Sequence, residues 1–408
     1  MDKAKWGWLV LFLVFVATGL NFLDRQVLSI VIIRIQKEFN MTDVEYGMIN
    51  TAFLIGYGIM FTVAGRLIDT VGSKRGLALS VGVWSLANCL HGFVNSFQQL
   101  LGSRLLLGLG EGGCFPGAAK TVSEWFTEKR RALANGVAIG GAAIGAVVSP
   151  PLTIYLSTNY GWRWSFVIPG LIGVVWVIVW LMMPDAPNRQ SASGQPRKKP
   201  MPFLAVVKNK EALVFIVIRF LLDPVVYFIM FWVPKYLNEE RHVSFERIGE
   251  LFWVPFLALG LSNITGGWFS DKLLTLNFSI NKARKTVMGI AAALTLTVPF
   301  ITTVSTPEIA VALMALFMLA HGFWITNYIT AIADIFGNQG TATVVGLSGT
   351  AGTLSSLLIN PMIGLIVQQY SYSPLWIVSG FLYPLAFILF IVFIPKIRSL
   401  SAANAENF

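Results

Sequence analysis

The sequence predicts an all-α polytopic membrane protein with twelve transmembrane helices in two six-helix halves. The first observation is composition: of the 408 residues, 55% are hydrophobic and 12% are charged, and the mean hydropathy is +0.68. A soluble domain is typically about 25% charged. The second observation is that the apolar residues form long runs, close to the roughly 20 residues that a helix needs to cross a bilayer.

The predicted spanning helices follow one another with short polar breaks. They cover residues 8–33, 45–68, 76–95, 98–119, 130–155, 162–184, 211–237, 246–270, 285–305, 308–331, 343–369 and 373–395. The widest break, 185–210, carries prolines and basic residues and is interpreted as a cytoplasmic linker. It separates an N-terminal six-helix bundle at 1–184 from a C-terminal bundle at 211–408, which ends in a short cytoplasmic tail.

The positive charges follow the topology rather than forming a nucleic-acid surface. The net charge is +10, and most Lys and Arg residues lie near the termini or in alternate loops, as the positive-inside rule requires. Both termini are therefore predicted to be cytoplasmic, in a multi-pass protein of the bacterial inner membrane. The opposite loops hold fewer cations, namely Arg34, Lys37, Arg163, Lys235, Arg241 and Arg247.

Nothing in the sequence predicts a metal site, a cofactor or an enzyme. Cys89 and Cys114 lie in apolar segments without metal-ligand spacing. There is no nucleophile–base pair, no phosphate-binding loop and no soluble domain of the kind that a sensor would need. The expected partners are a small organic anion, protons and the lipid bilayer, with no nucleic acid, and we expect the chain to function as a monomer.

Four charged residues interrupt the apolar helices of the first half. Asp24 and Arg25 lie inside the first run, where each charge costs roughly 2.5–3.5 kcal/mol on insertion scales. Arg104 and Glu111 lie on one face of the fourth predicted helix, about 10 Å apart along its axis. Because these two helices run in opposite directions, the four side chains can meet in one cavity, and an intramembrane cluster of this kind predicts a functional site.

The chemistry of this cluster indicates coupled binding of an anion and a proton. A guanidinium group offers a planar fork that matches both oxygens of a carboxylate. If a substrate anion draws an arginine away from a buried acid, that acid must take up a proton. A static salt-bridge network is the alternative interpretation of the same residues.

The two halves share sequence patterns. Gly65 to Asp69 and Gly267 to Asp271 both read G-x-x-x-D and precede a basic turn. The fifth and eleventh predicted helices are both rich in glycine, and small residues four apart let helix backbones approach closely. Their glycines are Gly136, Gly140, Gly141 and Gly145 in one and Gly346, Gly349 and Gly352 in the other. These matched patterns indicate duplicated halves.

On these features the whole chain resembles the major facilitator superfamily, with Gly65 to Arg75 similar to its signature loop. The chain departs from the family pattern at Thr70, where a basic residue is usual. The resemblance implies that Asp69, Lys74 and Arg75 latch the two halves on the cytoplasmic side. The matching Asp271 of the second half is assigned to the same gate.

The first half also resembles the anion:cation symporters, which include bacterial sugar-acid transporters, sialin and the vesicular glutamate transporters. The resemblance rests on Asp24-Arg25, Arg104, the run Gly108 to Pro116, and Glu124-Trp125-Phe126. It implies that Arg25 binds the substrate carboxylate, that Asp24 and Glu111 carry protons, and that Arg104 pairs with an acid during the cycle. Asn21 and Tyr57 are further candidate substrate contacts, while Phe22 stands where some relatives have a tyrosine.

The second half supplies candidate contacts to a sugar ring. Arg219 and Asp223 are one helical turn apart, before Pro224, and this pattern resembles the hexuronate branch. A structural ion pair beside a proline kink is the alternative. Other candidate substrate contacts are Tyr227, His321, Trp324, Asn327 and Asn360.

Together these features predict a proton-coupled symporter that imports a small organic anion, most plausibly a hexuronate such as glucuronate or galacturonate, by alternating access. Another sugar acid such as galactonate, or an anion exchanger without proton coupling, remains an alternative.

Overall fold

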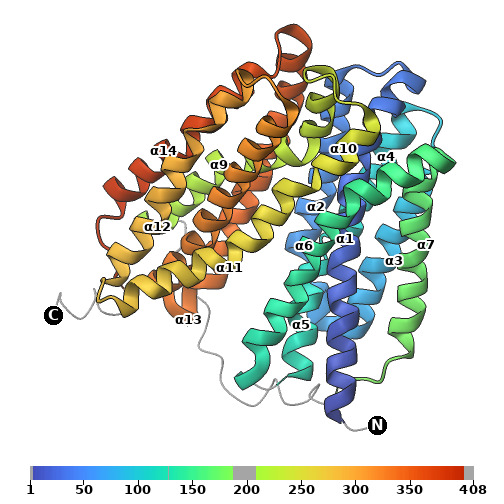
Figure 1. Ribbon diagram of the computed structural model, residues 1–408. Coiled ribbons are helices and arrows are strands. Elements are labelled where there is room, and N and C mark those ends of the chain that lie inside the picture. Colours follow the sequence, from blue (N-terminus) through green and yellow to red (C-terminus); the bar gives the residue numbers. More distant parts are fainter. Residues whose placement is uncertain (1–2, 127, 187–207, 399–408) are drawn as a thin grey trace. The chain divides into compact units, whose positions relative to one another are not determined.

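The computed structural model describes residues 3–126, 128–186 and 208–398 (Figure 1). Within these ranges the regular elements are helices, and no strand is present. Most of the predicted linker, at 187–207, lies outside the described residues.

The first seven helices cover the predicted N-terminal bundle. They are α1 (Lys3–Phe39), α2 (Asp43–Val71), α3 (Ser73–His91), α4 (Phe97–Glu111), α5 (Cys114–Trp125), α6 (Glu128–Tyr160) and α7 (Trp164–Met182). The remaining elements are α9 (Lys210–Glu239), α10 (Phe245–Leu251), α11 (Trp253–Thr275), α12 (Ile280–Thr295), the short 3₁₀ helix η2 (Val298–Thr302), α13 (Pro307–Gln369) and α14 (Ser373–Phe393).

Several helices begin at a residue that caps their free N–H groups. Thr42 starts α2 with a capping box, in which its side chain and that of Glu45 satisfy each other's backbone N–H. Ser96, Ser244 and Ser279 cap α4, α10 and α12 in the simpler way.

The predicted helix 98–119 is wrong as a single helix, because it divides into α4 and α5. Gly112 and Gly113 lie at the break, and Pro116 follows in the first turn of α5. Proline has no N–H to donate to the preceding turn but is tolerated in a first turn, and glycine weakens a helix, so the chain breaks here. Glu111 is consequently the last residue of α4.

Two other predicted boundaries also differ. The predicted helix 246–270 is interrupted at Phe252, between α10 and α11. The predicted helices 308–331 and 343–369 both lie within α13, whose helical backbone is continuous for 63 residues.

Nine helical stretches of the described chain are long and apolar enough to cross a membrane. They match the first predicted span and the fifth to the twelfth. The second, third and fourth predicted spans are helical, but their described parts are more polar or shorter. The fourth is the one that breaks before α5.

The chain forms two compact units, and each contains a part of α9 and of α13. Unit 1 consists of residues 1–195, 229–253 and 360–369, and unit 2 of residues 196–228, 254–359 and 370–408. Within unit 1, α1 packs along α6, α2 along α4, and α3 along α7 (Figure 1).

Glycine permits the closest helix contacts of unit 1. A Cβ atom on Gly141 would lie 2.0 Å from the carbonyl oxygen of Phe15, and one on Gly145 would lie 1.9 Å from that of Gly19. These contacts join α6 to α1. Between α2 and α4, a Cβ atom on Gly108 would lie 2.2 Å from the carbonyl oxygen of Phe53. Such close backbones hold α1 against α6 and α4 against α2.

Candidate functional site

The centre of the site in unit 1 is an ion pair between α1 and α4. The Arg25 guanidinium donates from Nε and Nη2 to Glu111 Oε2, over 3.0 and 2.9 Å. The two side chains are 4% and 0% exposed. The other carboxylate oxygen, Glu111 Oε1, has no hydrogen-bond partner among the described residues. Arg25 therefore directs two donors at one oxygen of the Glu111 carboxylate, and the same donors could bind a substrate carboxylate in its place.

Aromatic rings surround the Arg25 guanidinium. Its central carbon lies 5.0 Å from the ring centre of Phe22, 5.3 Å from that of Phe53 and 4.7 Å from that of Tyr57. Asn21 accepts a hydrogen bond from Nη2 over 3.3 Å. Cation–π contacts of this kind stabilise a guanidinium group away from water, and they place Asn21 and Tyr57 beside the candidate anion-binding group.

Asp24 does not join this ion pair, although it is adjacent to Arg25 in the sequence. It is fully buried and accepts a hydrogen bond from Asn88 Nδ2 on α3 over 2.8 Å. Asn88 also donates to the carbonyl oxygen of Phe166, over 3.1 Å, which fixes the orientation of its amide. The partner of Asp24 is thus a neutral amide rather than an arginine.

Arg104 is 2% exposed, and among the described residues no carboxylate lies within ion-pair distance of it. Its guanidinium carbon lies 5.8 Å from the ring centre of Phe53. It is near enough to Asp24 and Glu111 to act on both electrostatically. The structure therefore gathers the four predicted charges, but pairs only two of them directly.

In unit 2, Arg219 and Asp223 form an ion pair one turn apart on α9, with nitrogen–oxygen distances of 2.7 and 2.8 Å. The side chains are 21% and 10% exposed. Asp223 lies directly against α13, because a Cβ atom on Gly352 would be 1.9 Å from Asp223 Oδ2. The other two glycines of the predicted pattern make no such contact, because a Cβ atom on Gly346 or Gly349 would have no neighbour within 4 Å.

This contact makes a prediction about stability. We expect Gly352→Ala to destabilise the protein by about 1–3 kcal/mol, the usual cost of overpacking, because the new methyl group collides with the Asp223 carboxylate. Thermal unfolding of the purified protein measures the effect. Gly349→Ala on the same helix is the matched control and should unfold at or slightly above the wild-type temperature, because alanine favours a helix more than glycine does. Equal melting temperatures for the two variants would show that the Arg219–Asp223 pair is not held by α13.

The aromatic and polar candidates of α13 pack mainly against α14. The His321 Nδ1 atom lies 2.6 Å from the hydroxyl oxygen of Tyr383, and the Trp324 ring meets the Tyr383 ring edge-on at 5.5 Å. Asn327 donates to the carbonyl oxygens of Gly266 and Phe323. Arg219 acts electrostatically on both His321 and Tyr383, so these groups belong to the same region of unit 2.

The other candidates of the second half occupy different positions. Tyr227 is half-buried on α9, one turn beyond Asp223. Asn360 belongs to unit 1, is 1% exposed and accepts a hydrogen bond from Trp232 Nε1 over 3.2 Å. Asn360 thus belongs to a different compact unit from the other candidates of the second half.

The predicted gate residues make local contacts. Lys74 lies 3.7 Å from Asp185, and Arg75 is exposed. Asp69 lies in α2, but its side chain is outside the described ones. Asp271 pairs with Arg284 over 3.3 Å. Arg284 also bonds to Ser270 and Asp334.

The part of the chain that the structure describes contains no group of three His, Cys, Asp or Glu residues that could hold a metal ion. Cys89 and Cys114 are free thiols.

Comparison with known proteins decides the family. The family model described as "Major Facilitator Superfamily" matches residues 14–359. The chain belongs to the Major Facilitator Superfamily. It is therefore a multi-pass membrane transporter and not an enzyme, and the predicted twelve-helix, two-half fold class is confirmed.

Curated relatives within the superfamily carry sugar acids. The chain is 27% identical over 389 residues to the hexuronate transporter of Escherichia coli K12, covering 91% of this chain and 90% of that one. It is 26% identical over 404 residues to the D-galactonate transporter of Escherichia coli O6:H1, covering 92% and 93%. It is 28% identical over 408 residues to a probable galactarate/D-glucarate transporter of Escherichia coli K12, covering 90% and 91%. The predicted sugar-acid branch of the superfamily is confirmed.

Solved structures of the superfamily share the fold. A D-xylose–proton symporter superposes with a TM-score of 0.76 at 13% identity, covering 96% of this chain and 99% of that one. A bacterial homologue of the lysosomal transporter Spinster, in an inward-facing and occupied conformation, gives a TM-score of 0.72 at 18% identity, covering 95% of both chains. At these identities the likeness shows the fold alone.

Sequence reasoning missed two partners of the predicted site residues. Asn88 holds Asp24, and Tyr383 holds His321. Each is a polar group within an otherwise apolar helix, and this contrast could have indicated a buried polar contact. However, the sequence does not show which buried acid or ring such a group meets.

Proposed function

We propose that this transporter imports a sugar acid of the hexuronate class together with protons. The observation that carries the proposal is the buried Arg25–Glu111 pair, in which an arginine suited to a substrate carboxylate is held by an acid suited to a proton. The relatives that carry hexuronates, galactonate and galactarate or glucarate support the substrate class.

The substrate carboxylate and the Glu111 carboxylate compete for Arg25, and this competition couples substrate binding to proton uptake. When the substrate carboxylate takes the guanidinium fork, Glu111 loses its ion pair with Arg25, the one that it makes among the described residues. A buried carboxylate without a counter-charge is costly, so Glu111 takes up a proton as the substrate binds. When the substrate leaves on the other side, Arg25 returns to Glu111 and the proton is released.

Asp24 and Arg104 provide the second acid and the second base of the mechanism. Asp24 is held by the Asn88 amide, so its charge depends on more distant groups, among them Arg104 and Glu111. We assign Asp24 as a second proton carrier and Arg104 as the base that stabilises whichever acid is ionised. This arrangement keeps the cluster close to electrical neutrality through the cycle.

The unit 2 candidates are assigned to the sugar hydroxyls. Arg219 and Asp223 are partly exposed and offer donors and acceptors, and an aromatic ring can stack on a sugar face. The other residues of unit 2 assigned to the sugar hydroxyls are Tyr227, His321, Trp324 and Asn327. The candidate contacts assigned to the substrate in unit 1 include Asn21 and Asn360. Asp69, Lys74, Arg75 and Asp271 are assigned to the cytoplasmic gate. The protein is placed in the bacterial inner membrane as a monomer with both termini inside.

Competition by chemically related sugars tests the substrate class. We expect unlabelled glucuronate to inhibit uptake of labelled glucuronate into proteoliposomes, whereas glucose should not. Glucose lacks the carboxylate that replaces Glu111 on Arg25, so it cannot gain the roughly 1.5–3 kcal/mol of a hydrogen bond to a charged group there. Galactonate is a third competitor, and stronger inhibition by galactonate than by glucuronate would favour an aldonate. Equal inhibition by glucose and glucuronate would overturn the carboxylate role of Arg25.

A further inference from the structure

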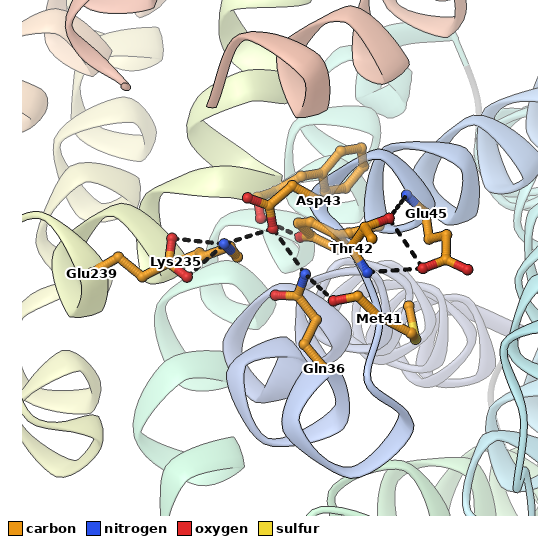
Figure 2. Close-up of polar contacts among 9 residues, drawn as sticks. Gln36, Met41, Thr42, Asp43, Glu45, Lys235 and Glu239 are labelled. Atoms are coloured by element: carbon orange, nitrogen blue, oxygen red, sulfur yellow. Dashed lines mark hydrogen bonds and ion pairs between the residues drawn. The ribbon is translucent and has the colours of Figure 1, made fainter. Parts of the chain in front are cut away.

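A second charge cluster lies in unit 1, away from Arg25 and Glu111, and is built around a buried lysine. Lys235 Nζ on α9 lies 2.7 Å from Asp43 Oδ1 and 2.6 Å from each carboxylate oxygen of Glu239 (Figure 2). The Lys235 side chain is 3% exposed. A single lysine thus holds two acids, Glu239 one turn further on its own helix and Asp43 at the start of α2.

Asp43 is also stabilised by groups from the first half of the sequence. Gln36 Nε2 on α1 donates to Asp43 Oδ1 over 2.9 Å (Figure 2). Asp43 also lies in the first turn of α2, where the positive end of the helix dipole stabilises a carboxylate. Each charge of the Asp43–Lys235 pair therefore has a second partner that belongs to its own half of the sequence.

The cluster borders a cavity of about 460 Å³. The cavity is lined by Ile33, Gln36, Lys37, Met41, Thr42, Asp43, Lys235, Asn238, Glu239 and Gln368. These residues come from the Phe39 end of α1, the start of α2 and the final turns of α9 and α13. By the predicted topology this is the outer side of the membrane.

Further contacts hold these helix ends together. Tyr46 on α2 bonds through its hydroxyl to the carbonyl oxygen of Phe231, and its ring lies 4.7 Å from that of Trp232. A Cβ atom on Gly47 would lie 2.7 Å from the carbonyl oxygen of Asn360. A Cβ atom on Gly364 would lie 2.5 Å from the carbonyl oxygen of Asp43. The backbones of α2 and α13 are therefore in direct contact beside the charge cluster.

The two compact units agree with the contact of α2 with the final parts of α9 and α13. Residues 229–253 and 360–369 group with the first half, although the preceding parts of α9 and α13 belong to unit 2. In alternating access, segments of one half that close against the other on one side must separate from it when that side opens.

We propose that Asp43 and Lys235 form the outer gate of the transporter, and that Glu239 is the partner that keeps Lys235 compensated when the gate opens. Opening breaks the contact of Lys235 with Asp43. Lys235 then remains paired with Glu239, because both residues are on α9. Asp43 still accepts the hydrogen bond from Gln36 and still lies at the positive end of the α2 dipole. Neither charge is left without a partner, so the gate can open and close without the large cost of an isolated buried charge.

This arrangement predicts opposite effects from two similar substitutions. Asp43→Asn removes the acid that closes the gate and should increase the outward-open population about fivefold or more. Glu239→Gln removes the acid that supports the open state and should decrease that population by a similar factor. A purely structural cluster would lose one of two equivalent contacts in each variant, and both would then shift the population in the same direction.

The populations can be measured without substrate, by double electron–electron resonance in nanodiscs. Spin labels at Asn159→Cys on α6 and Glu246→Cys on α10 lie at exposed positions of helices that contact each other in unit 1. Cys89 and Cys114 are replaced by alanine. The outward-open state should give the longer label separation.

A third variant tests the gate without changing a charge. Gly47→Ala places a methyl group against Asn360 and should favour the longer separation. Gly102→Ala on α4 is the matched control, because a Cβ atom there has no neighbour within 4 Å, and it should leave the distances unchanged.

The proposal is overturned if Asp43→Asn and Glu239→Gln shift the distances in the same direction, or if neither they nor Gly47→Ala shift them. Because no substrate is present, this outcome is independent of whether the transported anion is a hexuronate.

Discussion

Arg25→Lys is expected to weaken glucuronate binding by about 10- to 150-fold, which corresponds to the roughly 1.5–3 kcal/mol of a hydrogen bond to a charged group. The reason is geometric. Arg25 presents Nε and Nη2 together to one carboxylate, whereas a lysine ammonium group keeps the charge but cannot reproduce this fork. The rings of Phe22, Phe53 and Tyr57 also surround the planar guanidinium group. A lysine ammonium group would fill the space between these rings poorly.

Isothermal titration calorimetry of the purified protein measures this affinity. Arg163→Lys is the matched control, because Arg163 is a partly exposed arginine that pairs with Glu38 over 2.7 Å, away from the site. The Arg163→Lys variant should bind glucuronate with the affinity of the wild type. If Arg25→Lys also binds glucuronate as the wild type does, Arg25 is not the carboxylate-binding group.

Glu111→Gln is expected to abolish accumulation driven by a pH gradient while preserving exchange. Glutamine has the shape of the protonated acid, so the loaded carrier can still reorient. Accumulation also requires release of the proton and return of the empty carrier, which glutamine cannot support. Because glutamine competes less than a carboxylate for Arg25, the variant should bind glucuronate at least as tightly as the wild type.

Two assays on the same proteoliposomes separate these steps. Counterflow, with substrate on both sides, should proceed near the wild-type rate, and uptake driven only by an imposed pH difference should fall to background. Glu38→Gln, at a partly exposed ion pair, is the control and should retain both activities. Full pH-driven accumulation by Glu111→Gln would remove Glu111 as an essential proton carrier and leave Asp24 as the candidate.

Much of the architecture could be predicted from the sequence, because a membrane requires each spanning segment to satisfy its own backbone hydrogen bonds. This requirement makes apolar length a direct signal of helices, so the fold class was predictable. The same signal made Asp24, Arg25, Arg104 and Glu111 conspicuous, since charges within such helices are costly. The break between α4 and α5 was missed, because glycine and proline are also frequent within membrane-spanning helices and do not mark an end there.

The pairing within the site was decided only by the tertiary structure. Asp24 and Arg25 are neighbours in the sequence, but successive residues of an α-helix point about 100° apart. Arg25 consequently reaches Glu111 on α4, and Asp24 reaches Asn88 on α3. Nothing in the local sequence of α1 specifies which helix lies on which side of it.

The Asp43–Lys235 contact also separates what the sequence predicts from what the packing decides, here for residues far apart in the sequence. The sequence by itself determined that both residues lie at helix ends on one side of the membrane, because hydrophobic length and loop charge set the topology. Only the packing of the final turns of α9 and α13 against α2 decided that these two charges meet. Glycine at Gly47 and Gly364 lets the backbones come that close, and side-chain contacts between distant segments depend on such approaches rather than on local pattern.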